Sequence, residues 1–205
     1  SREVALQIQM GLSEEPTKLL IKALKDPCKK YRNAALDFAS NYADNTMYVE
    51  LGKLLAKSKA DVKVDVINWF GREAKCPKKH DLVRDLEIRF DLPFSLLLTQ
   101  QLNDKEFAVK EATVWTMLKI GDKSYIPTIA NLLTDSDKQI VLLAQDALFA
   151  FPGDIVNDVA KSIANATDEG KVAALELLAR RKATSKINTV LDQADKGSAN
   201  VKKAA

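Results

Sequence analysis

Residues 135–150 read DSDKQIVLLAQDALFA, and residues 167–180 read TDEGKVAALELLAR. Each stretch opens with a polar, acidic turn and continues with small and apolar residues at helical spacing, such as Leu143, Ala144 and Ala147. Residues three and four positions apart share one face of an α-helix, and small residues on that face let helices pack closely. Both stretches therefore predict a helix that buries one face against a neighbouring helix.

The same layout recurs along the chain. As an anchor we take the residue just before a position that is usually basic, which gives Tyr31, Val62, Val109, Ile140, Gly170 and Val201. Successive anchors are 31, 47, 31, 30 and 31 residues apart, so the period is 31 and one interval carries 16 additional residues. A fixed period of this length is typical of stacked structural repeats.

Each repeat also contains an earlier segment with apolar residues at helical spacing. These first segments lie at 17–26, 47–58, 94–104, 125–135, 154–166 and 186–195. A repeat is therefore expected to hold a first helix, a polar turn and a second helix, packed antiparallel. We expect one second helix to start with Pro27 in its first position and another to start at Ser136, which has capping-box spacing to Gln139.

The composition agrees with a helical repeat protein. The 205 residues include only 7 Gly and 6 Pro, too few turn-formers for a fold of many short strands. The 46% of hydrophobic residues excludes a wholly disordered chain, and the net charge of +3 is spread over segments of mixed sign. No apolar run approaches the ~18 residues of a membrane span, and the first residues lack the layout of a signal peptide.

These features resemble the HEAT-repeat family, especially its short bacterial units of the PBS-lyase type. The residues that carry the likeness are the acidic turns, the Ala pairs Ala34-Ala35, Ala173-Ala174 and Ala204-Ala205, and the basic residues after the anchors, Arg32, Lys63, Lys110, Lys171 and Lys202. The chain departs from the pattern at Val141, at Gly170 and at the insertion. The resemblance implies one domain over 1–205, an α-solenoid in which about six helix pairs of the HEAT or armadillo kind form a right-handed superhelix.

The phase of the repeat predicts that both ends of the sequence fall inside a second helix. Isolated solenoids use polar capping repeats, which neither end provides. We therefore expect a fragment of a larger bacterial protein, in contact with neighbouring domains of the same chain. The cytoplasm and the periplasm both remain open.

The 16 additional residues lie near 75–90 and read KCPKKHDLVRDLEIRF. We expect a short extra helix there, either as a spacer or as a functional edge of the array. The segment holds Cys76 and His80, the only histidine in the chain.

Signals for catalysis are poor. One histidine excludes every site that needs two, and Cys28 and Cys76 form neither a disulfide framework nor a CxxC pair. No phosphate-binding glycine loop and no nucleophile motif is present. We therefore expect no enzymatic activity, no cofactor and no metal site.

The basic residues after the anchors allow two interpretations. They could follow a nucleic-acid backbone, or they could bond to the turn carboxylates Asp26, Asp104 and Asp135, five residues before their anchors. We favour the structural ladder, and hence a protein or peptide partner rather than nucleic acid.

The sixth position after each of the first five anchors lies off the apolar face. It reads Asp37, Asn68, Trp115, Asp146 and Glu176. The resemblance implies that this row lines the concave surface, where Trp115 would either anchor a partner or pack between repeats. We expect a non-catalytic scaffold that binds a protein partner through this row.

Two alternatives belong to another class of function. The chain could be an accessory domain of an enzyme, as such arrays are in bilin lyases and sugar-processing enzymes. It could also resemble the HEAT-like DNA glycosylases, with Trp69, Trp115 and Asp65 as the residues that act. Such enzymes need a basic concave face, whereas the row in this chain is polar to acidic.

Overall fold

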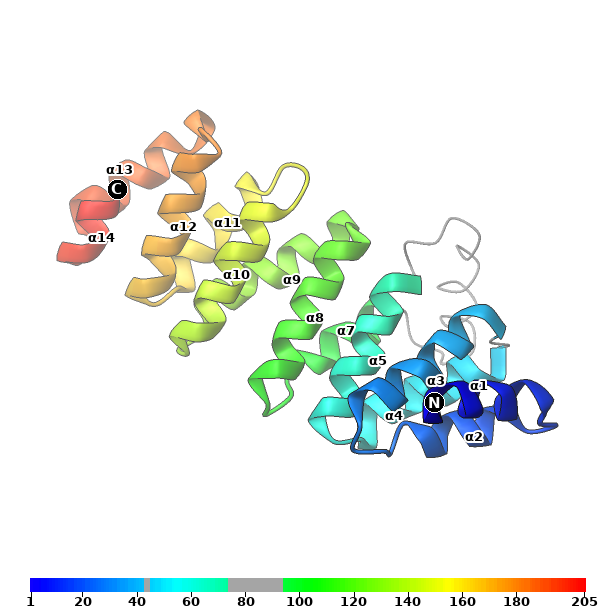
Figure 1. The fold of residues 1–205 in the computed structure, drawn as a ribbon. Helices are drawn as coiled ribbons and strands as arrows, with labels where there is room; N and C mark the ends of the chain where they lie inside the picture. The colour runs from blue at the N-terminus through cyan, green and yellow to red at the C-terminus, as the bar shows by residue number, and fades with distance from the viewer. Residues whose placement is uncertain (43–44, 74–93) are drawn as a thin grey trace. The chain divides into compact units, whose positions relative to one another are not determined.

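The computed structural model describes residues 1–42, 45–73 and 94–205, and this part of the chain is all-α, without a β-strand (Figure 1). The all-α part of the predicted fold class is thereby confirmed. The described residues group into two compact units, Ser1–Ile120 and Gly121–Ala205. The insertion predicted near 75–90, with Cys76, His80 and the expected extra helix, lies outside the described residues.

The first unit consists of helix pairs in which the second helices pack in a row. Its helices are α1 (Arg2–Leu12), α2 (Pro16–Ala23), α3 (Lys29–Tyr42), α4 (Asn45–Lys57), α5 (Ala60–Glu73), α7 (Phe94–Gln101) and α8 (Phe107–Ile120). Helix α1 packs on α3, α3 on α5, and α5 on α8. Each of α2, α4 and α7 packs on the second helix that follows it, and α2 also contacts α4.

The core of this unit is built from the positions that the helical period marked as apolar. Ala35, Ala39 and Val66 are fully buried, as is Trp69, whose Nε1 donates a hydrogen bond to Ser40 Oγ over 2.8 Å. Small alanines let α3 and its neighbours approach closely, while the large indole fills the space between α3 and α5.

The second unit repeats this arrangement with shorter first helices. It contains 3₁₀ turn η2 (Lys123–Tyr125), α9 (Ile126–Asn131), η3 (Leu132–Thr134), α10 (Lys138–Ala150), α11 (Val156–Ser162), η4 (Ile163–Asn165), α12 (Asp168–Arg180), η5 (Thr184–Lys186), α13 (Ile187–Lys196) and α14 (Ala199–Ala204). The second helices α10, α12 and α14 pack in order. The first helices α9, α11 and α13 each pack on the second helix that follows.

Side chains one repeat apart meet on neighbouring second helices. Gln145 Nε2 donates to Glu176 Oε2 over 2.7 Å, 31 residues along the chain. The Arg180 guanidinium lies 4.8 Å from the centre of the Phe149 ring, again 31 residues away. Neighbouring second helices of this unit therefore lie side by side in the register of the sequence period.

Two predicted helix starts are wrong by one or two residues. Helix α3 begins at Lys29 rather than Pro27, because Asp26 Oδ1 accepts the amide of Cys28 over 2.9 Å and holds the chain in a turn. Helix α10 is capped by Asp137, which accepts the Gln139 amide over 2.8 Å, and not by Ser136.

The missing side chain at the anchor Gly170 has a steric reason. A Cβ atom at this position would lie 1.9 Å from the carbonyl oxygen of Leu133. The start of α12 therefore packs directly against the backbone of η3, and only glycine allows that approach. What the sequence showed as a departure from the repeat pattern is a close helix contact in the structure.

Candidate functional site

The predicted polar row lies on the second helices and is divided between the two units. In the first unit Asp37 is exposed, with a carboxylate oxygen 3.5 Å from an Arg72 guanidinium nitrogen, while Asn68 and Trp115 are half-buried. In the second unit Asp146 and Glu176 are exposed. The structure brings together Asn68 and Trp115, which line one hollow, and places Glu176 in another.

The hollow of the first unit lies between α5 and α8 and has a volume of about 560 Å³. Trp115 forms part of its wall beside the aliphatic Val64 and Leu118, and Glu111 and Lys119 supply one charge of each sign. Val64 lies 47 residues before Glu111, the interval that contains the insertion. The half-buried indole therefore lines an open hollow.

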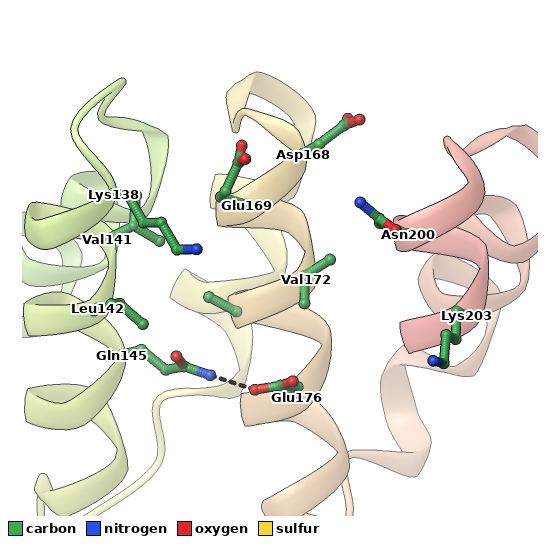
Figure 2. Close-up of a pocket in the computed structure, with 11 residues that line it drawn as sticks. Lys138, Val141, Leu142, Gln145, Asp168, Glu169, Val172, Glu176, Asn200 and Lys203 are labelled. Carbon is green, nitrogen blue, oxygen red and sulfur yellow. Dashed lines mark hydrogen bonds between the residues drawn. The ribbon is translucent and has the colours of Figure 1, made fainter.

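The hollow of the second unit lies on α10, α12 and α14 and has a volume of about 400 Å³ (Figure 2). First helices contribute none of its described lining. The lining residues are Lys138, Val141, Leu142, Gln145, Asp168, Glu169, Val172, Ala173, Glu176, Asn200 and Lys203. The hollow thus belongs to the face of the second helices that α9, α11 and α13 leave uncovered.

An apolar floor with a charged rim characterises this second hollow. Leu142 on α10 is 47% exposed, and the half-buried Val172 on α12 also lines the hollow. Figure 2 shows Lys138 and Gln145 reaching from α10 toward α12, where Gln145 donates to Glu176. One helical turn beyond Gln145, Phe149 is 50% exposed under the Arg180 guanidinium. Apolar side chains exposed in a group with polar neighbours mark a binding surface more often than single exposed ones do.

Sequence reasoning missed Leu142, Phe149 and Val172. They are apolar residues next to the polar row, and the sequence period alone assigns them to no particular surface. The spacing could have indicated their exposure, because Leu142 and Phe149 lie seven residues apart and share one face of α10 with the polar Asp146.

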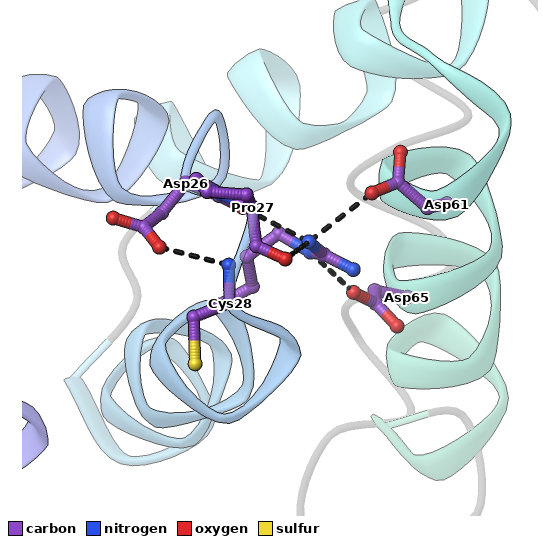
Figure 3. Close-up of polar contacts among 6 residues, drawn as sticks. Asp26, Pro27, Cys28, Asp61 and Asp65 are labelled. Carbon is purple, nitrogen blue, oxygen red and sulfur yellow. Dashed lines mark hydrogen bonds and ion pairs between the residues drawn. The ribbon is translucent and has the colours of Figure 1, made fainter.

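The predicted basic ladder makes two different kinds of contact in the first unit. Lys63 Nζ lies 2.7 Å from Asp104 Oδ2, which links the start of α5 to the turn before α8. Arg32 instead reaches Asp65 and Asp61 on α5, with nitrogen–oxygen distances of 2.7 and 3.1 Å (Figure 3). Among the described residues, Lys110, Lys171 and Lys202 have no ion pair within 4.0 Å.

Arg32 and Asp65 form a buried ion pair. Their side chains are 4% and 3% exposed, and the Arg32 guanidinium also donates to the carbonyl oxygens of Asp26 and Pro27 over 2.9 and 3.1 Å. These bonds compensate for the hydration that the Arg32 guanidinium loses when it is buried. Asp65 and Trp69, which the glycosylase alternative requires, are therefore buried and engaged in the packing of α3 against α5.

Turn carboxylates share one local role. Asp26, Asp104 and Asp135 each accept the amide two residues further on, over 2.9, 2.9 and 2.8 Å. The Lys63 ammonium, and then the Glu106 amide, hold the pKa of Asp104 below its usual range against the opposing effect of burial. The pKa of Asp26 is lowered chiefly by the Cys28 amide and further by Arg2.

Two further findings concern the described part of the chain. Within it, no three His, Cys, Asp or Glu side chains gather as a metal site would require. None of its helices has the length and apolar character needed to cross a bilayer.

Comparison with models of known protein families finds no match, and comparison with curated proteins finds none either.

Proposed function

We propose that this protein is a non-catalytic α-solenoid of the HEAT-like kind, a right-handed stack of helix pairs with a period of 31 residues. Its function in this proposal is to bind a protein or peptide partner on the face formed by the second helices. The insertion near 75–90 would interrupt one repeat without changing the register, since Val64 and Glu111, and likewise Asn68 and Trp115, line one hollow.

One observation carries the proposal, namely the hollow on α10, α12 and α14 with its exposed apolar floor. Leu142 is 47% exposed there, although its neighbour Val141 is buried. An aliphatic side chain of a partner would bury Leu142 and Val172, and the Lys138, Glu169 and Glu176 side chains would set its orientation. Full burial of an exposed leucine side chain contributes about 1.5–3 kcal/mol, and Leu142, which is 47% exposed, has about half of that left to gain.

Two of the five basic residues after the anchors have a structural role in this proposal, whereas Lys110, Lys171 and Lys202 have no ion pair within the described residues. Lys63 and Arg32 are occupied by carboxylates of the next repeat, at 2.7 Å in both cases, and are not free to follow a phosphate backbone. We therefore propose a protein or peptide partner rather than nucleic acid.

A test begins with a peptide selected by display against the immobilised chain. Its dissociation constant is then measured for wild type and for Leu142→Asp, which we expect to weaken binding at least about tenfold. Leu96→Asp is the matched control, because Leu96 is 41% exposed on the first helix α7. Trp115→Ala and Asp146→Ala test the other hollow and the rim of the α10 face in the same assay.

The proposal fails if Leu142→Asp, Trp115→Ala and Asp146→Ala all bind the peptide as tightly as wild type does. Far-ultraviolet circular dichroism and urea unfolding of each variant establish that a loss of binding is not a loss of fold. Binding that Leu96→Asp weakens as much as Leu142→Asp would also contradict the assignment of the face.

A further inference from the structure

A third hollow, of about 640 Å³, lies between the turn before α3 and the turn before α5. Residues 24–27 line one side of it, and the end of α4 with the start of α5 lines the other. It belongs to the first unit and shares no lining residue with the two hollows on the second helices. A ligand in this hollow would therefore be bound by a different set of side chains.

One buried side chain connects the two sides of this hollow. The Arg32 guanidinium donates to the carbonyl oxygens of Asp26 and Pro27 over 2.9 and 3.1 Å. The same guanidinium lies 3.1 Å from the Asp61 carboxylate on the other side (Figure 3). The hollow is thus held in shape by the protein itself, and a preformed site lowers the entropy cost of binding.

Three lysines from two consecutive repeats meet at the hollow. Lys25 follows α2, Lys57 ends α4, and Lys59 precedes α5. All three are exposed, and none of them has an ion pair within 4.0 Å among the described residues. Cations that converge on one concave surface raise the local concentration of anions.

The two carboxylates that line the hollow are already engaged. Asp26 forms an ion pair with Arg2, and Asp61 forms one with Arg32, which also binds the buried Asp65. With these partners included, the three lysines and two arginines face three carboxylates, which leaves an excess charge of +2. The hollow therefore favours a ligand that carries negative charge.

The floor of the hollow is apolar. Leu24 and Val62 are buried, Leu54 is half-buried, and Pro27 adds an exposed ring. A ligand that fills the hollow must therefore bring an apolar group together with its negative charges. A phosphate backbone offers no such group.

The lysines are also confined to this hollow. Lys63 Nζ is bound to Asp104, and Lys105 Nζ lies 3.7 Å from a Glu106 carboxylate oxygen, so both lysines next in line are paired. A nucleic-acid strand would need cations along several repeats. A short acidic segment needs only the three that meet here.

We propose that this hollow binds an acidic peptide segment of a partner protein. One aliphatic side chain of the segment lies on the floor beside Leu54, and flanking Asp or Glu carboxylates pair with Lys25, Lys57 and Lys59. The site goes beyond the proposed function, because it lies outside the hollow on α10, α12 and α14 and selects a partner by negative charge.

Isothermal titration calorimetry at low ionic strength tests the proposal with a short peptide, blocked at both ends, that has one leucine between two pairs of glutamates. We expect saturable binding to the chain and a Kd at least about tenfold higher for Lys59→Glu and for Lys25→Glu. Lys202→Glu is the matched control, because it makes the same charge change at an exposed lysine of the second unit. A peptide with serine in place of the leucine should bind more weakly, because it leaves the floor uncovered.

Four results would overturn the proposal. The first is a wild-type chain that does not bind the acidic peptide saturably, and the second is equal affinity for a peptide with glutamine in place of every glutamate. The third is a Lys202→Glu variant that loses as much affinity as Lys59→Glu and Lys25→Glu do. The fourth is a single-stranded oligonucleotide of equal charge that binds more tightly and is weakened by Lys59→Glu, which would assign the lysines to nucleic acid.

The two proposals fail separately. Leu142→Asp should leave binding of the acidic peptide unchanged, since Leu142 lies in the other unit. Lys59→Glu should in turn leave unchanged the affinity for a peptide that Leu142→Asp weakens. Circular dichroism and urea unfolding of each variant show whether the fold persists, as we expect for exposed lysines.

Discussion

Arg32 Nε donates a hydrogen bond to Asp65 Oδ2 over 2.7 Å, and both side chains are buried between α3 and α5. The same guanidinium also bonds two carbonyl oxygens in the turn before α3. A single side chain therefore connects a turn, its own second helix and the next second helix. Because both charges are out of water, Asp65 depends on Arg32 for compensation, while Arg32 also has Asp61 within 3.1 Å.

Removal of one partner should destabilise the first unit strongly. We expect Arg32→Ala to lower the free energy of unfolding by about 3–5 kcal/mol, because Asp65 is left as a buried, uncompensated carboxylate. Arg72→Ala is the control, since the Arg72–Asp37 pair is more than half exposed on both sides, and should cost less than about 1 kcal/mol. Urea unfolding followed by circular dichroism measures both, and equal effects would contradict the role of the buried pair.

Gly170 should tolerate no side chain. We expect Gly170→Ala to destabilise the second unit by more than about 2 kcal/mol, because its Cβ would lie 1.9 Å from the Leu133 carbonyl oxygen. Gly11→Ala is the matched control in helix α1, where the nearest atom to the new Cβ is 3.9 Å away. There the change should be neutral or stabilising, by up to about 1 kcal/mol. Thermal unfolding of the two variants measures both changes in stability, and a Gly170→Ala variant as stable as wild type would refute the close contact.

Acid should weaken the link between α5 and the turn before α8. The pKa of Asp104 is lowered in the folded chain, first by Lys63, so its contribution to stability is present in full above its ordinary value of 3.8. That contribution is lost as the pH falls from this value through the lower pKa of the folded state. We expect Asp104→Asn to be less stable than wild type at neutral pH, with a difference that shrinks below pH 3.8. A difference that stays constant across this range would show that Lys63 does not stabilise the charged carboxylate.

The repeat register could be predicted from sequence because it follows from spacing alone. Apolar residues at helical spacing place Ala35 and Ala39 on the buried face of α3 regardless of what covers them. The partner of Arg32 could not be predicted in this way. In the repeat that follows Arg32, the position five residues before the anchor holds Lys57, where other repeats hold Asp26 or Asp104. Arg32 therefore has no turn carboxylate to bind there, and only the packing of α5 shows that it binds Asp65 instead.

The candidate site was predictable only in part, for a similar reason. The sequence marks Asn68 and Trp115 as equivalent, and the structure places them in one hollow. The exposure of Leu142 and Phe149 depends on which parts of α10 the neighbouring helices cover. The local sequence pattern of α10 does not predict this. The starts of α3 at Lys29 and of α10 at Lys138 depend on which carboxylate accepts a turn amide, and several nearby side chains can do so.

Oxidative footprinting of the chain with and without the selected peptide shows where the peptide binds, because it reports side-chain accessibility on every helix. We expect Leu142 and Phe149, which are 47% and 50% exposed on the second helix α10, to lose reactivity when the peptide binds. Ile187 on the first helix α13 should keep its reactivity. Protection of Ile187 with unchanged reactivity at Leu142, Phe149 and Trp115 would contradict the claim that the second helices form the binding face.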